Sequence, residues 1–169
     1  MPIRNMWSLQ PGECLTAEKL AKIGKVFFPL RDVGVDLLVV KGDRHIRLQV
    51  KESRYYHLRK WKSGHIGYSW HQIRKEKLLK DDVDFYVFLT YKEDFGKHKV
   101  QGFENKFLIV PKEELKKKIE FKDAGKKNVY SFYFHFENEK VWDERVKNGP
   151  TDYSKFLDAW KLVEDALSS

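Results

Sequence analysis

The stretch of sequence that decides the fold reads GVDLLVVKGDRHIRLQVK over residues 34–51. Two runs rich in Val, Leu and Ile flank a short turn that contains Gly and Asp. This pattern predicts a β-hairpin with strands over 33–40 and 45–51. Everything else in the predicted site is placed relative to this hairpin.

The second strand of the hairpin carries polar residues on one face only. The period of two along a strand places Leu48 and Val50 on one side. Gln49 and Lys51 then project together from the opposite side, next to an isolated carboxylate, Asp36, in the first strand. A buried lysine or carboxylate is costly unless an opposite charge, a hydrogen bond or a metal compensates it. The hairpin therefore predicts a polar site.

The rest of the chain predicts a mixed α/β domain. A helix over 11–23 places Glu13 at the start of its inward face, and Gly24 suits a left-handed cap after it. We expect Cys14, in the same helix, to be buried. The remaining expected elements are strands over 25–30, 83–89, 106–110 and 129–136, and helices over 68–79, 111–119 and 152–167.

Length and composition favour a single domain over residues 1–169, because the chain has 169 residues and is 41% hydrophobic. No run approaches the roughly 18 consecutive apolar residues of a membrane span. The start lacks the apolar core of a secretion signal. The only cysteine, Cys14, excludes internal disulfides and multi-cysteine zinc sites. We therefore expect a cytoplasmic protein without a membrane partner.

Positive charge is concentrated in one segment of the chain. The whole sequence has 33 Lys and Arg against 25 Asp and Glu, a net charge of +8. Residues 54–80 contain eight basic residues and one acidic residue, a net charge of +7. A field concentrated in this way favours a polyanion as partner. The alternative is a solvated lysine-rich face.

The order of the polar residues resembles that of the PD-(D/E)XK nuclease superfamily. Its motif is an aspartate on one strand, followed on the next by an acidic or amide residue, any residue and lysine. Here it stands as Asp36 and then Gln49-Val50-Lys51, and Gly12-Glu13 is similar to the family's helix glutamate. The chain looks most like small nucleases with glutamine at the third position, including bacterial homing endonucleases of group I introns. Archaeal Holliday junction resolvases share the order. The resemblance is good over residues 12–53. From there to residue 119 it is weak and limited to the pattern of strands and helices, and it is absent beyond residue 119.

This resemblance implies a restriction-endonuclease-like α/β/α core, with a mixed central sheet flanked by helices, and a metal-dependent DNA endonuclease. The catalytic residues would be Glu13, Asp36, Gln49 and Lys51. Magnesium, for which manganese would substitute, would be bound by Asp36, the Gln49 side-chain oxygen, the Val50 carbonyl and Glu13. Lys51 would orient the attacking water and stabilise charge on the phosphoryl oxygens. We expect a homodimer, because cutting two strands usually needs two sites.

Gln49 departs from the commonest pattern, because it offers an oxygen ligand without a charge. Asp36 and Glu13 are then the obvious anions, since alternation points Glu52 to the face opposite Lys51. Taken singly, the four residues also have structural interpretations. These are an N-terminal helix acid for Glu13, a capped buried carboxylate for Asp36, a surface amide for Gln49 and an ion-pair partner for Lys51.

Residues 54–68 interleave basic and aromatic side chains, and we expect them to form a loop that contacts DNA. The residues expected to bind double-stranded or branched DNA are Arg54, Arg59, Lys60, Trp61, Lys62, Arg74 and Lys75. An aromatic packing loop is the alternative. Further residues expected to approach the site are Ser53, Trp70, His71 and Gln72, with a packing or surface role favoured for His71.

The sequence is also consistent with two other functions. One is a catalytically inactive DNA-binding module on the same fold, in which only the basic segment works. The other is a protein-interaction domain whose basic segment binds an acidic protein. Metal-dependent cleavage separates the nuclease from the first alternative, and competition by duplex DNA separates both from the second.

Overall fold

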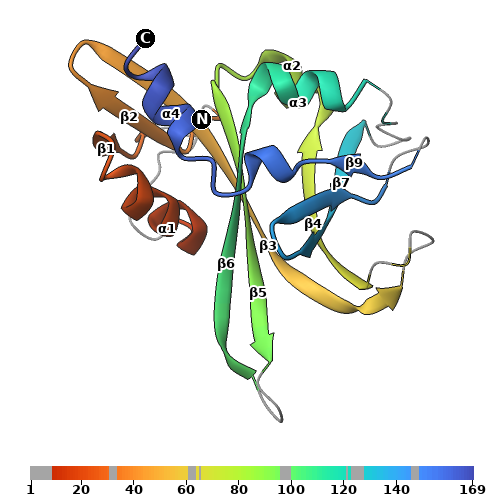
Figure 1. Ribbon diagram of the computed structural model, residues 1–169. Coiled ribbons are helices and arrows are strands. Elements are labelled where there is room, and N and C mark those ends of the chain that lie inside the picture. The colour runs from red at the N-terminus through yellow and green to blue at the C-terminus, as the bar shows by residue number, and fades with distance from the viewer. Residues whose placement is uncertain are drawn as a thin grey trace.

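The computed structural model describes residues 9–30, 34–60, 64, 66–95, 100–120, 122, 128–145 and 149–169. Strands dominate this part of the chain (Figure 1). They are β1 (Lys25–Phe27), β2 (Leu37–Lys41), β3 (Arg44–Lys60), β4 (Ile66–Arg74), β5 (Phe85–Phe95), β6 (Val100–Pro111), β7 (Val129–Glu137), β8 (Lys140–Asp143) and β9 (Thr151–Asp152). The helices are α1 (Pro11–Leu20), α2 (Lys75–Lys80), α3 (Lys112–Lys118), α4 (Lys161–Ala166) and the 3-10 helix η2 (Ser154–Phe156). Within the described ranges, no helix is both long enough and apolar enough to cross a membrane.

The long strand β3 joins two sheets. The first has the strand order β1-β2-β3-β5-β6 and the second has the order β3-β4-β7-β8-β9. Neighbours are antiparallel except β3 and β5, which run parallel and pair over residues 48–54 of β3. β2 pairs with β3 only as far as Leu48, and β4 pairs with it only from Tyr55. In the described sheets, residues 49–54 of β3 therefore have a strand partner on one edge alone.

Each face of the first sheet is covered differently. Leu48 and Val50 face a core that includes Leu20 of α1 and Val163 of α4. The opposite face, which carries Phe88, packs against the aromatic side chains of β7, with α2 and α3 at one end (Figure 1). The mixed α/β character is confirmed, but the expected layer of helices on both faces is wrong, because apolar side chains of the second sheet cover one face.

The expected loop over 54–68 is wrong over 54–60 and 66–68, and the expected helix over 68–79 is wrong over 68–74, whereas α2 confirms a helix over its last residues. Residues 54–60 continue β3, and 66–74 form β4, while 61–63 and 65 lie outside the described residues. Burial in β4 alternates strictly, which is the period of a strand with one buried face rather than of a helix. Its buried residues are Gly67, Ser69, His71 and Ile73, and its outward residues are Ile66, Tyr68, Trp70, Gln72 and Arg74.

The expected helix over 152–167 is wrong in its first half. β9 and η2 occupy this half, and helical structure returns only in α4. Asp152 Oδ1 accepts hydrogen bonds from the backbone N–H and the hydroxyl of Ser154, at 2.7 and 2.5 Å. Asp158 has a positive φ of 48°. Such local side-chain to backbone bonding and left-handed backbone interrupt a helix.

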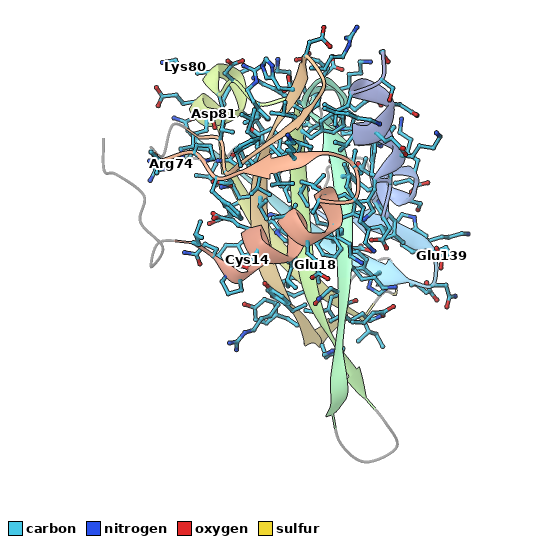
Figure 2. All side chains as sticks on the ribbon, turned by 90° about the vertical axis from the view of Figure 1, so that its left-hand side faces the viewer. Cys14, Glu18, Arg74, Lys80, Asp81 and Glu139 are labelled. Carbon is cyan, nitrogen blue, oxygen red and sulfur yellow. The ribbon has the colours of Figure 1, made fainter. Side chains whose placement is uncertain are left out.

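The first helix is shorter than expected and presents a different residue to solvent. α1 ends at Leu20 rather than at residue 23, and Gly24 does not adopt a positive φ. A Cβ on Gly24 would lie 2.7 Å from the Val40 carbonyl oxygen, so glycine there permits close approach to β2. Cys14 is exposed, contrary to expectation, and lies with Glu18 on the outward side of α1 (Figure 2).

Gly67 fixes the place where β3 and β4 pair. Its φ is +82°, and a Cβ there would lie 2.6 Å from Tyr55 Cε1. The Tyr55 hydroxyl crosses this space and donates to the Ile66 carbonyl oxygen at 3.1 Å. It also lies 2.9 Å from His135 Nδ1. Because Gly67 has no side chain, Tyr55 can pack against it and hold β3 and β4 together at their paired end.

We predict that Gly67→Ala destabilises the protein more than Gly64→Ala does. Both glycines have positive φ, which costs an L-residue about 1 to 2 kcal/mol. Only Gly67 also has a close neighbour, and overpacking adds about 1 to 3 kcal/mol. Urea unfolding of both variants measures the difference. Equal losses of stability would contradict the proposed role of the Tyr55 contact.

Candidate active site

Asp36 immediately precedes β2, at the end of that strand's pairing with β3. Its backbone N–H donates to the Leu48 carbonyl oxygen at 2.8 Å, and its Oδ2 accepts from the Val50 N–H at 2.8 Å. A strand residue directs its N–H and C=O toward the same neighbour, so the Val50 carbonyl also faces the Asp36 side of β3. Asp36 thus supplies the acceptor for β3 just beyond the last residue that β2 pairs.

Gln49 and Lys51 open into a cleft of about 500 Å³. β3 and β4 diverge from their paired end (Figure 1), and the side chains that line the cleft come mainly from these two strands. The residues that line it are Gln49, Lys51, Gln72, Ile73, Arg74, Lys77 and Val129. Three of these are cations and none is a carboxylate. The cleft therefore suits an anionic group such as a phosphate.

The Gln49 side chain is buried rather than superficial. It is 2% exposed, and its Oε1 has no hydrogen-bond partner among the described residues. A buried polar atom without a partner costs about 1 to 3 kcal/mol. The interpretation of Gln49 as a surface amide is therefore wrong, and its oxygen fits a cation or a donor that enters the cleft.

His71 of β4 lies close to Lys51 and is fully buried. Its Nε2 lies 3.2 Å from Ser69 Oγ and 3.3 Å from Thr90 Oγ1. Burial lowers the pKa of His71 to about 3; the backbone of Lys51 acts to raise this pKa, and the Lys51 charge acts to lower it. The imidazole is then neutral at neutral pH. It also contacts the rings of Phe88 and Phe134, which confirms the expected packing role.

Glu13 and Glu52 belong to the other side of β3. Glu13 is buried in the first turn of α1, and its Oε2 lies 3.4 Å from the Gln10 N–H nitrogen, as expected of a helix N-terminal acid. Glu52 Oε2 accepts from the Gly12 N–H at 2.7 Å and from the Tyr91 hydroxyl at 2.8 Å. The prediction that Glu52 points away from Lys51 is confirmed. These contacts hold the first turn of α1 beside the segment of β3 that β2 and β4 leave unpaired.

The four predicted catalytic residues therefore gather around one segment of β3 but not on one face. Gln49 and Lys51 project toward the cleft, Asp36 binds the backbone between them, and Glu13 comes from the α1 side. The described part of the chain contains no group of three or more His, Cys, Asp or Glu placed to hold a metal ion. A metal site here would depend on amide and backbone oxygens as well as carboxylates.

The predicted DNA-binding residues have different outcomes. Arg54 is exposed on β3, and Arg74 lines the cleft. Arg59 and Lys60 end β3, where only their backbone is described, and Trp61 and Lys62 lie outside the described residues. Among the expected neighbours, Gln72 lines the cleft, and Ser53 Oγ accepts from the Trp70 N–H at 3.1 Å.

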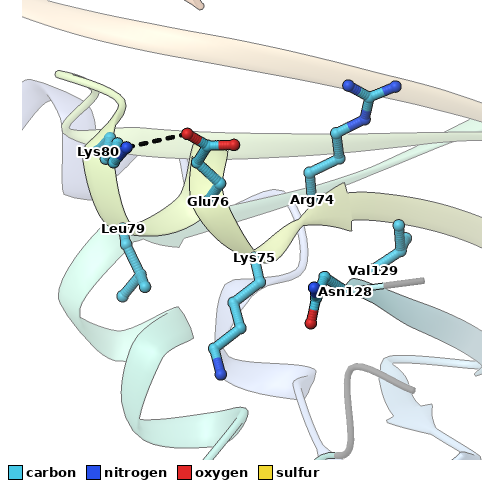
Figure 3. A pocket seen from close by; sticks show the side chains of 7 residues that line it. All are labelled: Arg74, Lys75, Glu76, Leu79, Lys80, Asn128 and Val129. Atoms are coloured by element: carbon cyan, nitrogen blue, oxygen red, sulfur yellow. Dashed lines mark hydrogen bonds and ion pairs between the residues drawn. The ribbon is translucent and has the colours of Figure 1, made fainter. Parts of the chain in front are cut away.

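A second pocket adjoins the cleft and contains Lys75 (Figure 3). The two hollows share Arg74 and Val129. Glu76 is bound by Lys80 at 2.9 Å, so the acid in this basic stretch is already paired. Lys77 also lines the cleft, although it was not predicted as a site residue. The sequence feature that could have identified Lys77 is its position in the basic segment 54–80, and α2 places it at the cleft.

We predict that Asp36→Ala and Asp36→Asn differ in stability. Alanine removes the acceptor of the buried Val50 N–H, which costs about 1 to 3 kcal/mol. Asparagine retains an oxygen at this place and loses less. Urea unfolding and hydrogen exchange at the Val50 amide, both without metal, measure the effect. Asp43→Ala in the exposed turn is the control, and an Asp36→Ala protein as stable as wild type would contradict the contact.

Comparison with known proteins identifies a fold. No family model and no curated protein matches the sequence. One solved structure, that of the bacterial homing endonuclease I-Ssp6803I, is similar at a TM-score of 0.55 and 16% identity. The match covers 93% of this chain and 88% of that chain. The chain therefore has an endonuclease-like fold, as the sequence resemblance implied.

Proposed function

We propose that the protein is a metal-dependent endonuclease that hydrolyses phosphodiester bonds of DNA in the cleft between β3 and β4. The observation that supports this most is the arrangement around Val50. Gln49 and Lys51 flank it and open into a cationic cleft, while its backbone N–H is bound by the Asp36 carboxylate. The endonuclease-like fold supports the same function.

The residues present fit a divalent cation such as magnesium, with manganese as a substitute. The buried Gln49 Oε1, which has no partner among the described residues, is an oxygen ligand in need of a positive neighbour. Asp36 would supply negative charge, the Val50 carbonyl a further oxygen, and Glu13 a carboxylate acting from the α1 side. Such hard oxygen donors are those that magnesium prefers. When bound, the cation would polarise the phosphate and lower the pKa of a water.

Lys51 and its cationic neighbours would act on the substrate. The Lys51 ammonium would orient water and stabilise charge on the phosphoryl oxygens of the scissile group. Arg74 and Lys77, which line the same cleft, would neutralise flanking phosphates. His71 stays neutral, so it adds no second charge next to Lys51. Glu13 would assist proton transfer.

DNA affinity would come from the basic segment around the cleft. We propose phosphate contacts by Arg54, Arg59, Lys60, Lys62, Arg74 and Lys75, with Trp61 against bases. A homodimer would present two such clefts to the two strands of a duplex or branched DNA.

A catalytically inactive DNA-binding module is the second candidate. The observation that favours it is that Asp36 and Glu13 each have a structural role that needs no metal. Asp36 binds the Val50 N–H, and Glu13 lies at the N-terminus of α1. Cleavage assays decide between the two functions.

We predict that Lys51→Ala lowers magnesium-supported cleavage by about 10²-fold or more, because it removes a stabiliser of transition-state charge. DNA affinity should change little, because many other cations contact phosphates. Nicking of supercoiled plasmid and binding to the same DNA in EDTA measure the two effects. Lys161→Ala, on α4 and paired with Asp165, is the matched control.

The outcome that contradicts this assignment is full cleavage by Lys51→Ala. Wild-type protein that binds DNA but does not nick it with magnesium or manganese would instead favour the binding module. Binding of an acidic protein that duplex DNA does not compete away would favour a protein-interaction domain.

A further inference from the structure

The solvent face of the second sheet carries four neighbouring aromatic rings. Tyr56 of β3 lies opposite Tyr68 of β4, with ring centroids 5.6 Å apart. Tyr68 lies 5.3 Å from Tyr133 of β7, and Trp70 stacks on Tyr133 at 6.3 Å. Tyr56 and Trp70 are each 44% exposed. We call these four residues the aromatic face.

Core packing does not account for the aromatic face. In β4 the buried positions are those that alternate with Tyr68 and Trp70, and they face the interior between the sheets. The outward positions need no large ring. Cross-strand aromatic pairs contribute at most about 1 kcal/mol each to a sheet. A contiguous group of exposed rings is instead typical of a binding surface.

Two exposed arginines border the aromatic face, where the half-buried Glu144 donates its backbone N–H to the Tyr133 carbonyl oxygen at 2.9 Å. Arg54 precedes Tyr56 by two residues and is exposed. Arg145 donates to the Tyr133 hydroxyl at 2.7 Å, with its guanidinium 5.2 Å from that ring. β4 and the part of β3 that pairs with it contain no Asp or Glu, and the acid of β7 is its last residue, Glu137. Two copies of such a face would repel each other, whereas a polyanion would be attracted.

The aromatic face continues into the cleft. Gln72 and Arg74 follow Trp70 on the same outward side of β4, and both line the cleft with Lys51. A nucleic-acid strand with its backbone at Lys51 could therefore lay its next nucleotides along β4. Bases stack on aromatic side chains only when they are unpaired, because in a duplex their faces are covered by neighbours.

We propose that the aromatic face binds the unpaired bases of single-stranded nucleic acid that continues from the cleft. The inference rests on the proposed DNA substrate and narrows it to DNA with an unpaired segment. Trp70, backed by Tyr133, supplies an exposed stacking surface, and Arg54 and Arg145 meet the phosphates. Because ring stacking reads no hydrogen-bond pattern, binding depends little on base sequence.

The test measures affinity without cleavage. Fluorescence anisotropy in EDTA compares a labelled oligothymidylate of about 15 nucleotides, a length near the upper end of known single-strand sites, with a duplex of equal length. Trp70→Ala should weaken single-strand binding by about 5- to 150-fold, the loss expected for one stacked base. Duplex affinity should stay within about twofold. Trp70→Phe, which keeps a ring, should retain most single-strand affinity.

Phe27→Ala is the matched control, because Phe27 is also an exposed aromatic, at 49%, but lies on β1. Cross-linking of a bromouridine-substituted single strand to wild-type protein gives a measurement that depends on no variant. Adducts in β4 or β7 support the proposal.

Three results overturn the inference. The first is cross-linked adducts found only outside β4 and β7. The second is an equal loss of single-strand and duplex binding in Trp70→Ala. The third is an unchanged single-strand affinity of Trp70→Ala together with a changed oligomeric mass. The nuclease proposal fails separately. Protein that binds the single strand through Trp70 but never cleaves DNA would keep this inference and refute the catalytic one.

Discussion

The hydrogen bond from the Val50 N–H to Asp36 Oδ2 is the interaction on which the site depends. β3 changes partner along its length, and neither β2 nor β4 pairs with residues 49–54. The unpaired edge of β3 would leave buried backbone N–H and C=O groups without hydrogen bonds, which costs free energy of folding. Asp36 satisfies the first of them. Placing a carboxylate there also puts negative charge beside Gln49, so the fold and the proposed metal site have the same origin.

The hairpin and the directions of its side chains could be predicted from the sequence. Alternation placed Leu48 and Val50 in the core and directed Glu52 away from Lys51, and the structure confirms both. These predictions succeeded because they depend on local geometry alone. The endonuclease-like fold was also anticipated from the motif. The joint action of Glu13 and Asp36 on one ion remains a prediction, because they approach β3 from different elements.

The segment that follows the motif could not be predicted in the same way. Its alternation was obscured because Ser69 and His71, which are polar, occupy buried positions of β4. Ser69 Oγ and His71 Nε2 both contact Thr90 Oγ1 of β5, an interaction that no local pattern reveals. The pairing of β4 with β7 joins residues far apart in sequence, so the second sheet and its aromatic face became visible only in the structure.

The proposed metal site requires that a divalent cation binds between Asp36 and Gln49. Anomalous diffraction from crystals soaked in manganese would locate such an ion. We expect one strong peak within coordination distance of Gln49 Oε1 and an Asp36 carboxylate oxygen, and no peak there in Asp36→Asn crystals. A manganese peak elsewhere in the protein, or a peak that persists unchanged in Asp36→Asn, would show that Asp36 and Gln49 do not form the metal site.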